Sequence, residues 1–414
     1  MRYPVIPIKE LARLQSGYAF KSHDWSKTGI PVVRIKNIKD GQLDLSDCAY
    51  VSEAVASAVD RYKIACGDIL FSMTGYIGER AWVGASEWIM LNQRVGRFIF
   101  DQTRSSEINR KYFFYVLGYI PVLQALQNRA HGAAQPNISP SAVGEVSIPL
   151  PPLDSQGKIA AILSTYDDLI ENNTRRIEIL EEMARRLYEE WFVQFRFPGH
   201  EGVKFKESEL GLIPEGWDLV PLGDIYRTGS GGTPSRKNPE FYGGDYRWVK
   251  TKELQDCPVF DTEERISEEG LKKSSAKLFP RNTVLIAMYG ATIGRLGVLQ
   301  EESATNQACC AILPNSQGCG WGYAYLSLFS RRQALIDLRA GAAQQNISQD
   351  VIKRFRLLRA SDELHNQFEM AVTPFLTLCF ALYRKNANLR AQRDLLLPKL
   401  ISGEIDVSDI PMPT

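Results

Sequence analysis

The chain has 414 residues, 44% of them hydrophobic and 23% charged, and a formal net charge of +1 at pH 7. This composition is typical of a folded globular protein and excludes a disordered, fibrous or disulfide-dense chain. The length allows two or three domains with ordinary cores. The small net charge argues against strong nucleic-acid binding by the chain without partners.

Membrane and metal functions find no support in the sequence. The longest apolar runs, 112–126 and 371–382, are too short to span a bilayer, and each contains a proline. The seven cysteines form no CxxC motif, and no histidine lies beside Cys309, Cys310 and Cys319. The first residues lead directly into structured-looking sequence without a signal peptide. We therefore expect a cytoplasmic protein with buried free thiols and no metal site.

The first part of the chain is predicted to be a mixed α+β domain. A helical pattern at Lys111–Asn128 precedes the segment Gly132-Ala-Ala-Gln-Pro-Asn-Ile-Ser139. Ser139 with Pro140 is typical of a helix N-cap followed by a first-turn proline. Short apolar and β-branched runs, separated by Gly, Asn, Asp and Pro, predict strands at Ile30–Ile35, Ile69–Met73 and Val95–Phe100.

A long helix is expected next. Pro152 and Asp154 mark its start, and Phe197-Pro-Gly199 marks its end. Its apolar residues follow alternating steps of four and three, which is the pattern of a coiled-coil seam, over about 50 Å at the helical rise. The seam consists of Ile159, Leu163, Tyr166, Ile170, Asn173, Ile177, Leu180, Ala184, Leu187 and Trp191.

The following segment repeats the first domain. Gly341-Ala-Ala-Gln-Gln-Asn-Ile-Ser348 matches residues 132–139 at seven of eight positions, 209 residues later. Strands are predicted at Val284–Met288 and Ala308–Leu313, and a helical pattern at Tyr323–Leu338. Further matches join Val5–Ile8 to Leu219–Leu222, Val32–Ile38 to Trp248–Leu254, Gly67–Met73 to Asn282–Met288, and Asn92-Gln93 to Asn306-Gln307.

A second long helix is expected after Ser361 and Asp362, with its seam in the same register. Asn173 and Asn386 would be polar seam residues that set the register at some cost in stability. Pro374 lies inside this helix and is expected to kink it. The second seam consists of Phe368, Val372, Phe375, Cys379, Leu382, Asn386, Leu389, Arg393, Leu396 and Leu400.

The expected fold class is therefore α+β. Two tandem mixed α/β domains are joined by two long antiparallel coiled-coil helices, as a pseudo-twofold internal repeat with one globule near each end of the helix pair. The predicted segments are a first domain at 1–152, a central helix at 153–199, a second domain at 200–360, a C-terminal helix at 361–403 and a tail at 404–414.

No catalytic motif is present in the sequence. There is no GxxxxGK[ST] phosphate loop, no GxSxG elbow and no HExxH helix. The glycine-rich segment Gly229–Pro234 lacks the lysine of a phosphate loop and is predicted to be a flexible loop. We find neither the Asn/Asp-Pro-Pro-aromatic stretch of amino-methyltransferases nor a nuclease carboxylate set. Catalysis by this chain alone is not expected.

Basic and amide side chains recur on glycine-marked loops beside strands. Arg, Lys, Asn and Gln are the side chains that read base edges and hold phosphates. Arg34 and Lys36, like Lys250 and Lys252, occupy alternate positions of a predicted strand and should share one face. The candidate DNA contacts are Arg34, Lys36, Thr74, Tyr76, Asn92, Gln93, Gln135, Asn137, Arg236, Lys250, Lys252, Tyr289, Arg295, Asn306, Gln307, Gln344 and Asn346.

Structural explanations compete with these assignments. Asn137 can be a turn residue, with Ser139 as the N-cap that follows it. The paired cations can be a solvated strand edge. Neither explanation accounts for Gln135 and Gln344, or for the small Gly-Ala-Ala that precedes each of them.

The order of elements resembles the DNA-specificity subunit of type I restriction–modification enzymes over essentially the whole chain. One departure from the pattern is Leu357-Leu-Arg-Ala-Ser361, which stands where a proline-rich copy of Ile148–Leu153 would be expected. Besides the repeated octapeptide and Ile148–Leu153, the resemblance rests on Gly67-Asp-Ile-Leu70, on Phe241-Tyr-Gly-Gly-Asp245 with Trp248-Val-Lys250, and on Leu397-Pro-Lys-Leu-Ile-Ser-Gly403.

The resemblance implies a non-catalytic subunit. Each domain would read one half of a split site in double-stranded DNA, and the helices would set the spacing. Two modification subunits would dock on the chain, and motor–nuclease restriction subunits can join them. S-adenosylmethionine, ATP and Mg²⁺ would belong to these partners, and this chain would bind no cofactor. The target base would be an adenine flipped by the partner.

The charge map is consistent with a need for partners. The net charge is +4 over residues 1–150, −3 over 151–200, +2 over 201–360 and −2 over 361–414. An excess of six positive charges on the two domains is small against the phosphate contacts that dominate DNA affinity. The alternatives are a tandem module for peptide or carbohydrate ligands, and a nuclease or methyltransferase fragment.

Overall fold

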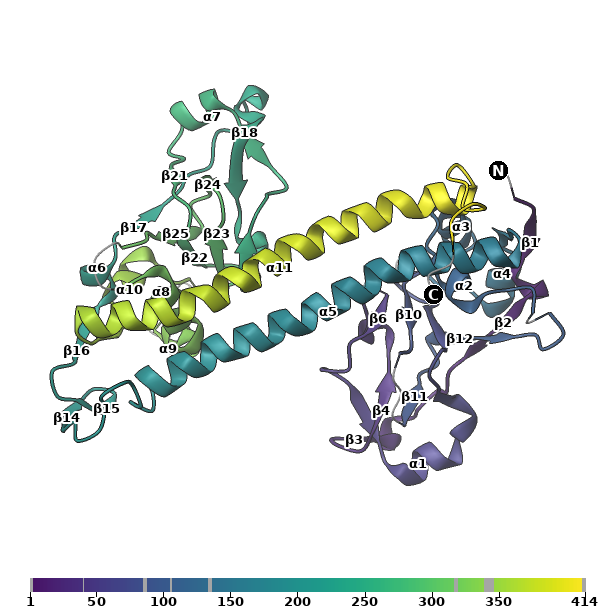
Figure 1. The fold of residues 1–414 in the computed structure, drawn as a ribbon, viewed down its shortest axis with the longest axis horizontal. Helices are drawn as coiled ribbons and strands as arrows, with labels where there is room; N and C mark the ends of the chain where they lie inside the picture. The colour runs from purple at the N-terminus through teal and green to yellow at the C-terminus, as the bar shows by residue number, and fades with distance from the viewer. Residues whose placement is uncertain are drawn as a thin grey trace. The chain divides into compact units, whose positions relative to one another are not determined.

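The computed structural model describes residues 3–39, 41–84, 88–104, 106–132, 136–315, 319–338 and 346–411. The chain divides into two compact units, Met1–Ile170 with Asn388–Thr414, and Glu171–Ala387. Each unit contains one mixed α+β domain together with part of each long helix, α5 (Leu153–Phe192) and α11 (Asp362–Ser402) (Figure 1).

The first unit contains two principal sheets. The four-stranded sheet has the antiparallel order β10-β9-β12-β2, and the five-stranded sheet has the order β3-β7-β4-β11-β8, with β4 and β11 parallel. Two small pairs, β1-β13 and β5-β6, complete the strands. The strands are β1 (Val5–Pro7), β2 (Ala12–Ser16), β3 (Trp25–Ser26), β4 (Ile30–Val33), β5 (Ile38–Lys39), β6 (Gln42–Leu43), β7 (Ala49–Val51), β8 (Lys63–Ile64), β9 (Ile69–Ser72), β10 (Arg80–Trp82), β11 (Ile89–Leu91), β12 (Val95–Phe100) and β13 (Ser147–Pro149).

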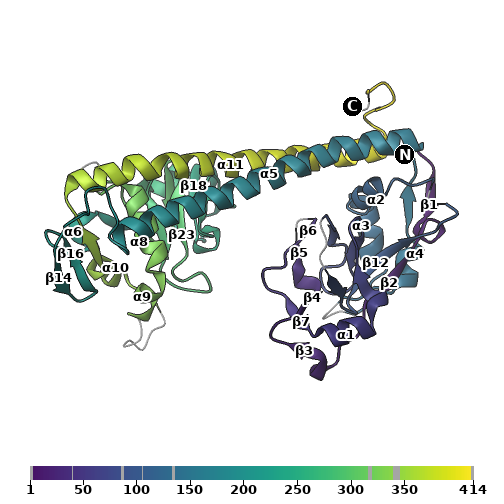
Figure 2. The ribbon, with the colours of Figure 1, turned by 60° about the horizontal axis from the view of Figure 1, so that its bottom comes forward.

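Short helices cover both sheets of this unit, with Ala56 of the first helix packed among residues of the five-stranded sheet. They are α1 (Glu53–Ala58), α2 (Arg110–Val116), α3 (Ile120–Gln127) and α4 (Pro140–Gly144), and Figure 2 shows α4 beside β1 and β2. Asn109 caps α2 by accepting N–H groups from Lys111 and Tyr112. Phe113 of α2 packs edge-on against Phe98 of β12, with ring centroids 4.9 Å apart. The predicted helical patch 111–128 is confirmed, although it is divided into α2 and α3.

The second unit repeats this plan. A five-stranded sheet has the order β17-β25-β22-β23-β19, and a four-stranded sheet has the order β20-β18-β24-β21, with β18 and β24 parallel. The strands are β14 (Phe205–Ser208), β15 (Gly211–Pro214), β16 (Asp218–Pro221), β17 (Thr228–Ser230), β18 (Tyr242–Val249), β19 (Cys257–Val259), β20 (Arg265–Ile266), β21 (Leu278–Phe279), β22 (Val284–Ala287), β23 (Leu296–Leu299), β24 (Ser303–Thr305), β25 (Cys309–Ile312) and β26 (Arg356–Arg359). The helices are α6 (Leu222–Ile225), α7 (Glu268–Lys272), α8 (Trp321–Ser330), α9 (Arg332–Asp337) and α10 (Gln349–Arg354).

Strand pairs at the start and end of each domain confirm the sequence repeat. β1 pairs with β13, and β16 pairs with β26, both antiparallel. The helix N-caps repeat as well, because Ser139 accepts an N–H from Ala142 and Ser348 accepts one from Val351. The segment 357–361, which departs from the proline-rich pattern, still leads into α11 directly at Asp362.

The two long helices run antiparallel, as predicted. In the second unit, Asn173 Nδ2 donates to Asn386 Oδ1 at 2.9 Å, and Asn386 Nδ2 donates to Thr174 Oγ1 at 3.2 Å. In the first unit, Arg393 Nη1 donates to Asp167 Oδ1 at 2.6 Å. The buried seam residues Asn173 and Asn386 thus satisfy each other's polar groups, which would be costly if left alone, and the half-buried pair Asp167 and Arg393 joins the helices further along.

Burial confirms both predicted seams. In the first unit, Ile159, Leu163 and Leu400 are buried within the domain core. In the second unit, Ile177, Ala184, Phe368, Val372 and Leu382 join the core of that domain. Leu180, Leu187, Leu389 and Leu396 are half-buried. The seam therefore belongs to each domain's core as well as to the helix pair.

Pro374 lies inside the second long helix without ending it, and the kink expected there stays a prediction. α11 runs unbroken from Asp362 to Ser402. Proline removes the hydrogen bond to the carbonyl four residues earlier. That carbonyl belongs to Met370, whose side chain is 78% exposed, and Pro374 is exposed too. Because this face of the helix is open to water, solvent can satisfy the free carbonyl.

His365, near the start of α11, is fully buried in the second unit. Its ring stacks on Phe192 at 5.3 Å and meets the edge of Tyr323 at 4.5 Å. Its Nε2 accepts the N–H of Ala360 at 3.1 Å, so the folded state holds the neutral ring. Burial, aided by the charge of Arg359 and opposed by that of Asp362, lowers the pKa of His365 to about 4.

This burial predicts a loss of stability in acid. The folded-state pKa of His365 lies below the ordinary value of 6.5, so the unfolded chain takes up a proton first as the pH falls. Stability is complete above pH 6.5 and should fall by on the order of 3 kcal/mol as the pH drops through 4. His365→Gln, which copies Gln156 at the equivalent position of the first helix, should lack this component. Denaturant unfolding of both proteins at pH 7 and 4.5 measures the difference, and equal pH slopes would contradict the assignment.

Candidate nucleic-acid interface

Each domain brings a cation and an amide to the ends of two neighbouring parallel strands. In the first domain, Arg34 follows β4 and Asn92 follows β11, and the Asn92 N–H donates to the Val33 carbonyl at 3.1 Å. In the second domain, Lys250 follows β18, and the Asn306 N–H donates to the Val249 carbonyl at 2.9 Å. Carboxyl ends of parallel strands share one edge of a sheet. The sequence-predicted residues Arg34 with Asn92, and Lys250 with Asn306, are therefore neighbours in both domains.

Two glycines allow a preceding loop to approach this edge. A Cβ on Gly17 would lie 2.4 Å from the Asn92 carbonyl oxygen, and one on Gly231 would lie 1.9 Å from the Thr305 carbonyl oxygen. Any side chain would push the loop away. Gly231 and Gly232 are buried, and the Gly232 N–H donates to Thr305 at 2.9 Å. The expectation of a flexible loop at Gly229–Pro234 is therefore wrong, because close packing fixes this segment.

The cations at this edge lie on tight turns and not on strands, which corrects the sequence prediction. β4 ends at Val33, and residues 35–37 form a 3-10 turn. The cause is a side-chain cap, because Asn37 Oδ1 accepts the Arg34 N–H at 3.0 Å. Glu253 does the same for Lys250, at 2.6 Å. Alternate positions therefore do not define a common strand face here.

The residues after β9 join the end of the repeated octapeptide to the sheet edge at which Arg34 and Asn92 lie. In the first domain, the Met73 N–H donates to the Arg94 carbonyl at 3.2 Å, and the Ile138 N–H donates to the Met73 carbonyl at 2.9 Å. Thr74 Oγ1 donates to Asn137 Oδ1 at 2.8 Å. A cleft of about 480 Å³ lies here, lined by Ser16, Met73, Thr74, Gln93, Arg94, Asn137, Ile138, Ser139 and Pro140.

The second domain repeats the backbone of this turn. The Met288 N–H donates to the Ala308 carbonyl at 2.9 Å, and the Ile347 N–H donates to the Met288 carbonyl at 2.8 Å. Asn346 is exposed at this point. Gln135 and Gln344, which carry the strongest sequence argument, lie outside the described residues, so their assignment stays a prediction.

The remaining candidate DNA contacts differ in solvent exposure and in whether the side chain already has a partner within the domain. Tyr76 is 80% exposed, between Gly75 and Gly78, which both have positive φ. Gln93 and Gln307 are exposed, whereas Tyr289 is half-buried. Asn92 and Asn306 each accept a backbone N–H two residues later, so their side chains also shape the turn. Arg295 is exposed and forms an ion pair with Asp256, away from the strand edge.

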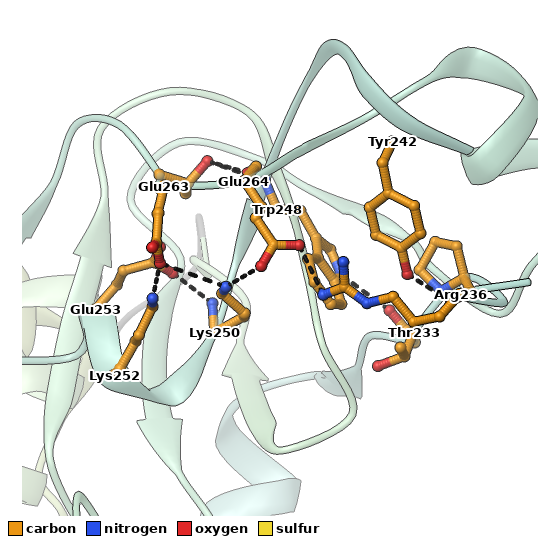
Figure 3. A network of polar contacts seen from close by, with 12 residues as sticks. Thr233, Arg236, Tyr242, Trp248, Lys250, Lys252, Glu253, Glu263 and Glu264 are labelled. Atoms are coloured by element: carbon orange, nitrogen blue, oxygen red, sulfur yellow. Dashed lines mark hydrogen bonds and ion pairs between the residues drawn. The ribbon is translucent and has the colours of Figure 1, made fainter. Parts of the chain in front are cut away.

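Acidic partners of the cations were missed by the sequence analysis. Lys36 pairs with Asp47, and Lys252 pairs with Glu263. Lys250 Nζ lies 2.5 Å from Glu264, and Arg236 Nη2 lies 2.7 Å from the same carboxylate. Figure 3 shows Glu264 between these two cations. Asp47 and Glu263 are separated by the same 216 residues as Lys36 and Lys252, so a longer repeat alignment could have found them.

Other kinds of site are not seen in the part of the chain that the structure describes. No group of three or more His, Cys, Asp or Glu residues there could hold a metal ion. No helix among those residues combines the length and apolar character needed to cross a membrane. All seven cysteines are free thiols.

Two equivalent polar edges, on two copies of one α+β domain, define a tandem-repeat binding protein with two related recognition surfaces. The chain belongs to the family of type I restriction modification DNA specificity domains, whose model matches residues 3–182 and 214–358. The two matches coincide with the two copies that the octapeptide repeat predicts, so the fold class predicted from the sequence is confirmed.

Individual relatives agree with this membership. The chain is 26% identical over 328 residues to the type I restriction enzyme HindI specificity subunit of Haemophilus influenzae, covering 65% of this chain and 71% of that subunit. It is 26% identical over 305 residues to the MjaIX specificity subunit of Methanocaldococcus jannaschii, covering 72% and 70%. The crystal structure of a type I restriction–modification S subunit from M. genitalium has the same fold, with a TM-score of 0.64 over 97% of this chain and 96% of that one, at 15% identity.

Proposed function

We propose that this chain is the DNA-specificity subunit of a type I restriction–modification complex. Each domain reads one half of a bipartite site in double-stranded DNA, and the helices α5 and α11 set the spacing between the halves. The observation that carries the proposal is the sheet edge that both domains share. In each domain, a cationic residue follows one of two neighbouring parallel strands and an asparagine follows the other. Cations and amides are the groups that hold phosphates and read base edges.

Two modification subunits are the proposed protein partners, and motor–nuclease restriction subunits can join them. The acidic stretch 151–200, with a net charge of −3, would face protein and not DNA. The partners would add the positive surface that the two domains lack. S-adenosylmethionine, ATP and Mg²⁺ would be bound by the partners, so this chain is non-catalytic and carries no cofactor.

The purified chain alone is expected neither to methylate nor to cut DNA, and to bind it weakly. Adding the modification subunits and S-adenosylmethionine should yield methylated adenine at a bipartite site. Affinity of the complex should fall steeply with salt, with a slope near −5 or steeper for six or more phosphate contacts. Methyl-transfer assays and binding titrations from 50 to 200 mM salt provide the measurements. Robust methyl transfer by highly purified chain alone would refute the non-catalytic role.

The alternative, a tandem module for peptide or carbohydrate ligands, makes the opposite prediction about salt. Binding of an uncharged ligand depends little on salt, because no counterions are released. A complex that binds such a ligand and shows no preference for any DNA sequence would favour the alternative.

A further inference from the structure

The two domains differ in the acidic side chains beside their shared cations. Arg34 and Lys250, Lys36 and Lys252, and Asp47 and Glu263 are equivalent pairs, each 216 residues apart. The same separation makes Cys48 the equivalent of Glu264. The flanking ion pair is present in both copies, whereas this exchange, together with that of Asn37 for Glu253, adds carboxylates beside the cations of the second domain.

In the first domain the shared cation has no described acidic partner. Arg34 is half-buried and lies over the ring of Trp25, 5.9 Å from its centroid. Its Nε is buried and without a hydrogen bond to any described residue. Burial raises the pKa of the Cys48 thiol, which therefore stays uncharged at pH 7 and cannot offset the guanidinium. Asp47, which pairs with Lys36, lies within electrostatic range of Arg34, but the described residues of the first domain give Arg34 no direct carboxylate contact like that of Glu264 with Lys250.

In the second domain Glu264 compensates two cations at once. Its carboxylate receives Lys250 Nζ at 2.5 Å and Arg236 Nη2 at 2.7 Å. The Arg236 Cζ lies over two rings, 4.2 Å from the centroid of Tyr242 and 5.5 Å from that of Trp248. Together with the neighbouring ion pairs, these residues form a row of alternating charges, shown in Figure 3, that consists of Lys252, Glu263, Lys250, Glu264 and Arg236. Hydrogen bonding to Lys250 lowers the pKa of Glu264, so the carboxylate is charged at neutral pH.

The row adjoins the polar edge of the second domain. Lys250 follows β18 and lies next to Asn306. Thr233, three residues before Arg236 in the chain, donates its Oγ1 hydroxyl to Gln307. Tyr242 donates its hydroxyl to the Pro234 carbonyl at 2.6 Å, and Trp248 Nε1 donates to the Gly232 carbonyl at 3.0 Å. The aromatic rings beneath Arg236 are therefore fixed to the same rigid glycine segment that carries it.

We infer that Glu264 and Arg236 are specificity-determining residues that read a G·C base pair in the second half-site, and that Cys48 leaves Arg34 free to hold a backbone phosphate in the first. A carboxylate is repelled by phosphates, so at a DNA interface its favourable partner is the amino group of cytosine. A guanidinium held over aromatic rings and beside a carboxylate suits the two acceptors of guanine. The inference rests on the proposed function of the chain.

The test uses the full chain assembled with its modification subunits. Competition binding compares a duplex carrying the mapped site with duplexes in which each base pair of either half is changed in turn. The variants are Glu264→Gln, Arg236→Lys and Cys48→Glu. The control is Glu269→Gln on α7 of the same domain, which removes the exposed ion pair between Glu269 and Lys273. Thermal melting checks that each variant folds.

Glu264→Gln should lower discrimination at one G·C pair of the second half about 10-fold or more, with the first half unaffected. It should also steepen the slope of log affinity against log salt by about 0.9, because one negative charge is lost. Arg236→Lys should lower the same discrimination without changing the slope, since the charge is kept and the planar fork is lost. Cys48→Glu should make the slope shallower by about 0.9.

Three results would overturn the inference: a second half-site without a G·C pair, a Glu264→Gln complex that behaves like Glu269→Gln, or equal losses in both halves. Failure of the proposed function gives a different result, because the wild-type complex would then prefer no bipartite site at all.

Discussion

Exchanging residues 1–150 for the equivalent segment of a relative with different specificity should change one half of the recognised DNA site and leave the other half intact. The reason is that each domain has a separate core and a separate polar edge. Each mismatched base pair typically costs about 1–3 kcal/mol, so a half-site with several changed pairs should no longer be bound specifically. Mapping methylated adenines in a host that carries the hybrid gene and its partner genes measures the outcome.

The matched control is the reciprocal exchange of residues 210–360, which should change only the other half. Base pairs between the halves should stay unread in both hybrids, with half-site centres roughly 10–15 base pairs apart. A single continuous motif, or a hybrid altered in both halves, would contradict the model of two independent recognition domains.

Repetition and periodicity explain why much of the fold could be predicted. The octapeptides at 132–139 and 341–348 revealed two copies, and an element found in one copy supported its equivalent in the other. The seams were predictable because a long helix exposes one face at regular steps of three and four. The N-cap Ser139 was predictable from the sequence because the proline that follows it is typical of a first helical turn.

Long-range pairing explains what could not be predicted. The parallel neighbours β4 and β11 are joined across more than fifty residues, and no local pattern shows that Arg34 would meet Asn92. The 3-10 turn after β4 is stabilised by the Arg34 N–H, which donates to Asn37 Oδ1, and this local cap overrides the strand pattern. Glu264 carries no local signal of its two cationic partners. The structure brings Arg34 beside Asn92 and Lys250 beside Asn306 at strand ends, whereas the acidic partners of these cations could be found only from the structure.

Replacing Ile177 by Asp should be the most damaging single change along the helix pair. Ile177 is 4% exposed and lies in the same core as Phe368, Val372 and Leu382. The substitution removes apolar contacts and places an unpaired carboxylate among them, which together cost about 4 kcal/mol or more. For a unit of this size, the melting temperature should fall by about 10 °C. Assembly with the modification subunits should be lost as well.

Ile179→Asp is the control that separates burial from helix propensity. Ile179 is on the same helix, two residues away, and is 59% exposed, so both variants introduce the same residue into the same α5 turn. The control should melt close to the wild type, because an exposed aspartate is solvated. Hydrogen exchange should show lost protection in Glu171–Ala387 for Ile177→Asp, while the sheets of the first domain, whose core does not contain Ile177, stay protected. If the two variants melt alike, the seam is not part of the second domain's core, and α5 is held by other contacts.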